Sequence, residues 1–429
     1  MKLNYKQTFL IGFGFFASSI AWAMYNNYVP ILLKNYLTST TLIGIVMTFD
    51  NIFGVIFQPI FGTLSDKTRT RFGRRMPYIL IGIPVCAIAF PFIPFTKSLF
   101  SLMAVVIIFN FVMSTWRAPV VALMPDLTPA PLRSQANGII NFMGGLGSLF
   151  SFFAGGLLFK AGGMPLPFAA SALLMLVAVI VLKVFIKENE TVQLQDQQEE
   201  KTTDPASAEH ANSEPYEHFP EDRIKKAEKN RSLIFLLFAI LFWFTGYNAV
   251  ETFFSLYVTN TLKDAAGNLL TAGDASLLLS IFSLTFLFFS IPAGFISGKI
   301  GRKTTIMIGL IGVMLLFTLM MFTDNIWQLR VLLLFGGVFW ACVNINSLPM
   351  VVEMAKWKDI GKYTGYYYFF SFSAAIISPI LFGAIRDLVQ RYDAIFIYSA
   401  IAFGLAALCM LFVHHGEADP KKAGMITGD

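Results

Sequence analysis

The sequence predicts an all-α integral membrane protein with twelve transmembrane helices arranged as two pseudo-symmetric halves of six. Three observations lead to this fold class. Of the 429 residues, 56% are hydrophobic and only 14% are charged, against about 25% charged in soluble domains. The apolar residues gather in runs long enough to cross about 30 Å of hydrocarbon. A polar segment divides these runs into two sets, and a short basic loop follows the second run of each set.

In the first half, residues 1–187, we expect spans at 8–33, 41–64, 77–95, 99–124, 136–159 and 165–186. The first run follows Lys2 and Lys6, and it is too long for the core of a signal peptide, so we interpret it as a span. Residues 188–231 are rich in Gln, Glu, Asp and Lys and cannot bury a core, which predicts a flexible cytoplasmic linker.

In the second half, residues 232–414, we expect spans at 232–258, 275–298, 304–323, 328–352, 363–385 and 394–414, followed by a tail at 415–429. The loop Gly62 to Pro77, GTLSDKTRTRFGRRMP, carries five cations and one acid. Because Lys and Arg are retained on the cytoplasmic side, this loop and both termini are predicted to be cytoplasmic. We expect a multi-pass protein of the cell (plasma) membrane, with the lipid bilayer as its surroundings.

Composition also excludes several classes of protein. Lys and Arg exceed Asp and Glu by 32 to 26, but their concentration on one predicted side reflects topology and gives no reason to expect a nucleic acid partner. Cys86, Cys342 and Cys409 lie in apolar runs, and the four histidines form no metal-ligand pattern. No P-loop, HExxH or Gly-x-Ser-x-Gly motif is present. We therefore expect no enzyme, no cofactor and no metal site.

The two halves look like copies of one another. Three pairs of segments recur at nearly constant spacing: Gly73-Arg74-Arg75 with Gly301-Arg302-Lys303, Asp126 with Glu353, and Tyr25-Asn26 with Tyr247-Asn248. Parallel repeats of six spans place a substrate site near the middle of the membrane, where the halves meet.

The basic loop resembles the signature loop of the major facilitator superfamily, in the lengthened form of its sucrose and glycoside–cation symporter branches. Gln58-Pro59 and the run APVVALMPDLTP, Ala118 to Pro129, also resemble those sugar carriers. The resemblance implies a proton-coupled or cation-coupled transporter that works by alternating access, with a sugar as its small-molecule substrate.

The same resemblance implies gating contacts at the cytoplasmic face, which brace that face closed and break as the carrier turns over. An acid after the second span is favoured at a neighbouring helix N-terminus, and the cations of the loop can reach a carboxylate at the end of span four. The expected gating residues are Asp66, Arg74, Arg75, Asp126, Arg302 and Glu353. The second copy of the loop departs from the pattern, because Gly298 stands where the first has an acid. An alternative is that the cations only fix topology.

Charged residues inside the spans are the candidates for coupling, because a buried charge is expensive and needs a partner. Asp50 and Arg117 lie at similar depths in spans two and four, and we expect Asp50 to exchange the coupling proton beside Arg117. A static ion pair between these spans is the alternative. Melibiose-type sodium carriers have a second aspartate one turn on, where this chain has Gly54, which favours a proton over sodium. Glu251 is a further coupling candidate, although it could instead reach the headgroup region.

Aromatic and amide side chains on the spans are typical of a sugar site, since rings stack on C–H faces and amides bond hydroxyl groups. Trp22 and Asn26 share a face of span one, with Tyr25 and Asn27 beside them. The expected substrate-binding residues are Trp22, Tyr25, Asn26, Asn110, Asn137, Asn141, Trp243, Tyr247, Asn248, Trp340, Asn344 and Tyr366. Each amide could alternatively serve only as a hydrogen bond between helices.

These patterns together predict a symporter that takes up a disaccharide, an oligosaccharide or a glycoside with a proton. One alternative is a proton-driven efflux antiporter for amphipathic compounds. Span five has Gly155-Gly156 but lacks the Gly-Pro pair of such antiporters, having Ser151-Phe152 instead. Another alternative is a membrane sugar sensor that does not transport.

Overall fold

The computed structural model describes residues 3–128, 132–188, 220–323, 325–355 and 360–417. The helices are α1 (Tyr5–Lys34), α2 (Thr40–Met47), α3 (Phe49–Lys67), α4 (Met76–Ala89), η1 (Phe90–Phe95), α5 (Leu99–Asp126), α6 (Arg133–Gly162), α7 (Pro165–Phe185), α9 (Pro220–Thr261), α10 (Ala272–Ile300), α11 (Arg302–Met320), α12 (Ile326–Glu353), α13 (Ile360–Val389) and α14 (Ala394–Leu411).

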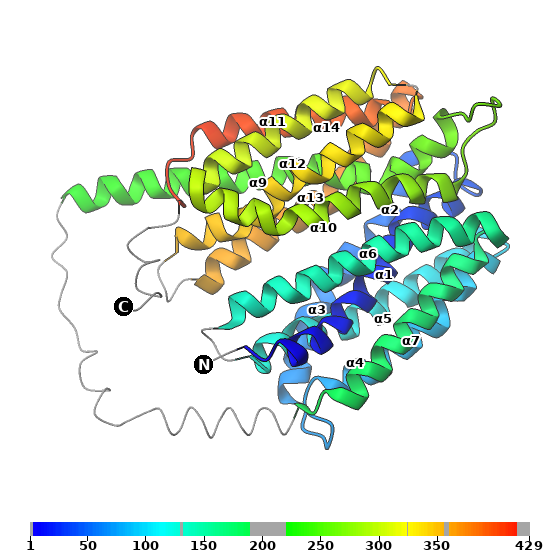
Figure 1. The fold of residues 1–429 in the computed structure, drawn as a ribbon, viewed down its shortest axis with the longest axis horizontal. Coiled ribbons are helices and arrows are strands. Elements are labelled where there is room, and N and C mark those ends of the chain that lie inside the picture. The colour runs from blue at the N-terminus through cyan, green and yellow to red at the C-terminus, as the bar shows by residue number, and fades with distance from the viewer. Residues whose placement is uncertain (1–2, 129–131, 189–219, 324, 356–359, 418–429) are drawn as a thin grey trace.

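Within those residues, twelve helical segments are long and apolar enough to cross a membrane. Two of them are composite, since α2 with α3 forms the second span and α4 with η1 the third. The predicted fold class is therefore confirmed. Figure 1 shows helices α1–α7, coloured blue through teal to green, on one side of the molecule and helices α9–α14, coloured green to red, on the other.

Two details differ from the expected boundaries. The second span, expected to run unbroken over 41–64, is interrupted at Thr48. The Thr48 hydroxyl donates to the Ile45 carbonyl (2.8 Å), and the Asn51 N–H donates to the Asp50 carboxylate (2.6 Å). These side-chain bonds compete with the backbone hydrogen bonds of the helix. The helix of the seventh span begins within the expected linker, because α9 starts at Pro220, whereas its candidate span is Glu228–Thr261. Residues 189–219 of the expected linker lie outside the described part of the chain.

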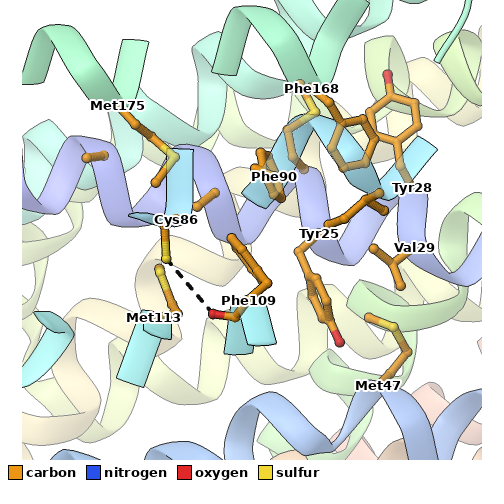
Figure 2. Close-up of a cluster of buried hydrophobic side chains, with 14 of the residues drawn as sticks. Tyr25, Tyr28, Val29, Met47, Cys86, Phe90, Phe109, Met113, Phe168 and Met175 are labelled. Carbon is orange, nitrogen blue, oxygen red and sulfur yellow. Dashed lines mark hydrogen bonds between the residues drawn. The ribbon is translucent and has the colours of Figure 1, made fainter. Parts of the chain in front are cut away.

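Buried aromatic rings form the core of the first half. Phe90 of η1 lies 4.8 Å from Phe109 of α5 and 4.8 Å from Phe168 of α7, between ring centroids. Tyr25 of α1 stacks on Phe109 at 5.9 Å. Figure 2 shows this cluster, in which the Cys86 thiol points toward the Phe109 carbonyl. The core therefore joins α1, α4, η1, α5 and α7 into one unit.

The halves pack against each other along α1 and α9, α2 and α13, and α6 and α10. We call the end of the bundle with the loops at 68–75 and 301 the basic end, and the other end the outer end. At the outer end Asp387 of α13 accepts hydrogen bonds from Thr40 N (2.8 Å) and Thr41 N (2.9 Å) at the start of α2. Lys160 of α6 forms an ion pair with Asp274 of α10 (2.6 Å).

Close backbone approach accompanies these polar contacts. A Cβ at Gly156 of α6 would lie 2.8 Å from the carbonyl oxygen of Gly273 on α10, and a Cβ at Gly44 of α2 would collide with the Pro379 carbonyl of α13. Such contacts require glycine, because any side chain would push the helices apart. Together, the α2–α13 and α6–α10 contacts form what we call the outer seal, and they close the bundle at the outer end.

Candidate functional site

A cavity of about 470 Å³ lies between the two halves. Helices of the first half contribute a mainly polar wall, which includes Ser18, Asn26 and Arg117. Helices α10, α11, α12 and α14 contribute a mainly apolar wall, which includes Phe282 and Leu316. The cavity therefore suits a ligand with polar groups on one side and an apolar face on the other.

Two opposite charges stand in the wall of this cavity. Arg117 of α5 and Glu251 of α9 both line it, so the coupling candidate Glu251 lies in the cavity wall. The Asn26 amide and the Arg117 guanidinium are the polar neighbours of Glu251. The Arg117 guanidinium also lies over the Trp22 ring, 4.7 Å from its centroid. The α1, α5 and α9 helices thus meet at one charged point.

Asp50 lies behind this point rather than in the cavity wall. Its side chain is buried, with 5% of its surface exposed, and both Asn51 N and Asn51 Nδ2 donate to it (2.6 and 2.7 Å). Its charged neighbours are Glu251 and Arg117, although in the described structure no carboxylate oxygen of Asp50 lies within the 4 Å of an ion pair from an Arg117 nitrogen. Asp50 therefore faces the protein interior, and it is not held in a closed ion pair in this conformation.

This group of Asp50, Glu251 and Arg117, which we call the charged trio, has a simple charge balance. With both carboxyl groups ionised the trio carries one net negative charge, and with one proton bound it is neutral. A buried net charge is costly in a low dielectric. The arrangement can therefore hold one exchangeable proton next to a cavity.

An aromatic pair, Tyr247 and Trp340, lines the cavity on the side of the second half. The rings of Tyr247 and Trp340 are parallel, with centroids 4.4 Å apart and planes 6° apart. Phe403 packs edge-on against Trp340 at 6.1 Å, and Asn344, one turn after Trp340 on α12, also lines the cavity. The pair offers a flat apolar surface beside an amide.

The expected substrate-binding residues separate into two groups. Those in the cavity wall are Trp22, Asn26, Tyr247, Trp340 and Asn344. The others lie outside that wall in this conformation: Tyr25, Asn110, Asn137, Asn141, Trp243, Asn248 and Tyr366.

Several of this second group make other contacts. Asn110 donates to the Tyr25 hydroxyl (3.1 Å) behind the wall. Asn141 and Asn248 donate to carbonyl groups one turn earlier in their own helices (2.9 and 2.7 Å). Asn137 and Tyr366 are exposed. The hydrogen bonds of Asn110, Asn141 and Asn248 in this conformation are therefore made to other groups of the protein.

The expected gating residues form two clusters at the basic end, and each cluster stays within its own half. Arg75 bonds both Asp66 and Asp126, the latter at 2.8 Å, and Arg74 pairs with Asp126 at 2.7 Å. In the second half, Arg302 lies 3.4 Å from Glu353. These pairs connect helix ends inside a half.

Sequence reasoning missed two carboxylates that complete these clusters. Glu188, which follows α7, is buried and accepts from the backbone N–H groups of Arg74, Arg75 and Met76 (3.0 Å each). Glu417, which follows α14, accepts from Arg302 N (2.6 Å) and Lys303 N (2.8 Å). The two acids stand at equivalent places in the repeat, each just after the last span of its half, so a search of the repeat for acids could have found them.

In the described residues, twelve candidate spans in two halves, with a cavity between the halves and a seal at one end, are the architecture of a membrane transporter. Comparison with known proteins agrees. The sequence model of the Major Facilitator Superfamily matches residues 11–273 and 262–426. The chain belongs to this superfamily.

Relatives within the superfamily differ in the function that their names state. The tetracycline resistance protein, class H, of Pasteurella multocida is 24% identical over 405 residues, 92% of each chain. The multidrug resistance protein MdtG of Proteus mirabilis is 30% identical over 190 residues, and the match covers only 44% of that protein. The sucrose transport protein SUC3 of Arabidopsis thaliana is 30% identical over 126 residues, which cover 24% of this chain and 21% of that protein.

Solved transporters share the fold. The nucleoside transporter NupG aligns with a TM-score of 0.69 at 16% identity, over 95% of this chain and 99% of that one. A bacterial homologue of the lysosomal transporter Spinster, in an inward-facing and unoccupied conformation, aligns with a TM-score of 0.67 at 12% identity, over 98% of this chain and all of that one.

Proposed function

We propose that the chain is a proton-coupled symporter that takes up a sugar, either a disaccharide, an oligosaccharide or a glycoside. The observation that carries this proposal is the cavity wall in which Glu251 and Arg117 stand beside the Asn26 amide and the Tyr247–Trp340 ring pair. Carboxylate and amide groups bond sugar hydroxyls, and flat rings cover the apolar faces of a sugar. The partial match to a sucrose transport protein supports the same substrate class.

The charged trio supplies the proton coupling in this proposal. Binding of one proton neutralises the trio, and a neutral trio is easier to enclose in the membrane interior than a charged one. Sugar hydroxyl groups that bond Glu251 would then favour the loaded, protonated carrier. With the basic end cytoplasmic, the sealed outer end corresponds to the carrier state from which sugar and proton leave into the cell.

The test is uptake into proteoliposomes under imposed proton and sodium gradients. Labelled sucrose, maltose and an aryl glucoside are offered separately, and we expect accumulation of at least one under a proton gradient. Asp50→Asn and Glu251→Gln should abolish accumulation, and at least one of them should retain exchange of sugar for sugar. Accumulation driven by sodium alone, or full proton-driven uptake in both variants, would refute the coupling mechanism.

A second candidate function is efflux of amphipathic compounds in exchange for protons. The apolar wall built from α10, α11, α12 and α14 favours it, as does the similarity to a tetracycline resistance protein along almost the whole chain. The same proteoliposomes discriminate the two functions. An antiporter would move a hydrophobic cation or tetracycline in the direction opposite to protons that flow down their gradient. Its transport rate would respond weakly to changes in the hydroxyl pattern of the substrate.

A further inference from the structure

Asn27 of α1 contributes to the wall of the cavity, yet its amide has no hydrogen-bonding partner. Only 1% of the residue is exposed, and neither its nitrogen nor its oxygen has hydrogen-bond geometry with a group in the described part of the chain; the Tyr28 hydroxyl lies close but outside that geometry. Buried amides almost always find partners, because an unpaired buried donor or acceptor is strongly unfavourable. A side chain of this kind at a cavity indicates a partner that comes and goes.

The surroundings of Asn27 place it between the charged trio and the outer seal. Asn26, its neighbour in sequence, faces Glu251. On the other side, the Tyr28 hydroxyl lies near both Asn27 and Ser276 of α10, and it too lacks a hydrogen bond in the described structure. Ser276 donates to the Phe152 carbonyl of α6 (2.9 Å), one turn from the Gly156–Gly273 crossing.

The closed seal therefore buries the Asn27 amide and the Tyr28 hydroxyl, which no described protein group bonds. Opening of the outer end would expose these groups to water, so burying them without a partner opposes closure. A ligand that presents a matching group would remove this resistance. An amide both donates and accepts, and its natural complement is a group that does the same, such as a hydroxyl group. A carboxylate or an ammonium group would leave half of the amide unpaired.

We propose that Asn27 determines specificity by binding a hydroxyl group of the substrate, and that this bond forms as the outer end closes over the loaded cavity. The inference rests on the proposed function insofar as the substrate is a sugar. It adds a contact at the outer end of the cavity, separate from the charged trio and from the Tyr247–Trp340 pair.

The test compares Asn27→Leu with the unchanged chain, purified in full length. Leucine has a similar size and no polar atoms. Binding of the transported sugar and of its set of single-deoxy analogues is measured by calorimetry. We expect Asn27→Leu to bind the parent sugar about tenfold more weakly, the effect of one lost hydrogen bond. One deoxy analogue should bind both proteins equally, because it lacks the hydroxyl group that Asn27 would hold. Asn27→Ser, which keeps a donor and an acceptor, should restore part of the affinity.

Asn346→Leu is the matched control. Asn346 is also a buried amide in a span, but it donates to the Cys342 carbonyl of its own helix (2.9 Å) and does not line the cavity. Its substitution should leave sugar affinity unchanged. Thermal unfolding adds a second readout, since Asn27→Leu breaks no hydrogen bond and should not lower the melting temperature.

Three negative results are distinguishable. If the unchanged chain binds sugar and Asn27→Leu binds every analogue with the same affinities, the role of Asn27 is refuted and the proposed function stands. The same holds if Asn27→Leu weakens all analogues equally and lowers the melting temperature, which would show a structural residue. If the unchanged chain binds no sugar at all, the proposed function and this inference fail together.

Discussion

Substitution of Asp387 by asparagine should open the outer seal. The Asp387 carboxylate of the second half accepts four hydrogen bonds from the start of α2 in the first half. The donors are Ser39 Oγ (2.7 Å), Thr40 N (2.8 Å), Thr41 N (2.9 Å) and Thr41 Oγ1 (2.8 Å). An asparagine keeps the shape but loses the charge, and its NH₂ group cannot accept. Because the contact joins the halves, its loss destabilises only conformations in which the seal is closed.

The size of the effect follows from these contacts. A hydrogen bond to a charged group contributes about 1.5–3 kcal/mol, against about 0.5–1.5 kcal/mol for a neutral one. An anion at a helix N-terminus adds about 0.3–1 kcal/mol. The asparagine loses one of the two accepting oxygens, and the hydrogen bonds to the remaining oxygen become weaker. We therefore expect the sealed conformation to lose about 2–3 kcal/mol of stability, which shifts the equilibrium between sealed and open conformations roughly 30- to 150-fold.

Spin labels at Asn35 and Lys263, two exposed outer-end positions in opposite halves, would report the shift. Pulsed electron–electron double resonance spectroscopy should give a longer distance between the two spin labels in Asp387→Asn than in the labelled protein without this substitution. The control is Asp393→Asn, an acid at the same end that bonds Arg391 of its own half. Identical distance distributions in Asp387→Asn and its parent would show that the seal does not depend on this carboxylate.

Three further substitutions test other parts of the structure. Arg117→Leu leaves the two buried acids Asp50 and Glu251 without their cation and should lower the free energy of unfolding by about 3 kcal/mol or more. Thermal unfolding should show the largest loss of stability at alkaline pH, where both acids are ionised. Arg117→Lys, which keeps a cation, should lose less stability. Gly273→Val inserts a side chain where a Cβ would already meet Gly156 O at 2.9 Å, so the same label pair should report a more open outer end; an unchanged distance would argue against close packing there. Glu188→Gln weakens the bonds to the start of α4, and a loss of about 1–3 kcal/mol in thermal stability is expected, whereas an unchanged melting temperature would count against this carboxylate as a brace.

The number and order of the spans could be predicted because a membrane demands long apolar runs. The interruption at Thr48 could not, since it depends on local side-chain bonds of Thr48 and Asp50 to the backbone. The early start of α9 at Pro220 was missed because a helix can continue beyond the membrane as a polar segment.

The site was predicted less completely, for a physical reason. Most spans are apolar all round, so the sequence does not reveal which face of a helix points inward. Glu251 and Asn344 were placed in the cavity wall by the structure, whereas Asn137 and Asn248 were not. Asn27 stood out only once its burial and lack of partners were visible.

The bonds of Glu188 and Glu417 have a consequence for how the chain could be divided. Each acid fastens the last helix of a bundle to the start of that same bundle's third span, and neither reaches across to the other bundle. The polypeptide could accordingly be severed between residues 189 and 219 and made as two separate pieces. Co-expressed in one membrane, the two pieces would be expected to find each other and work as a two-subunit carrier.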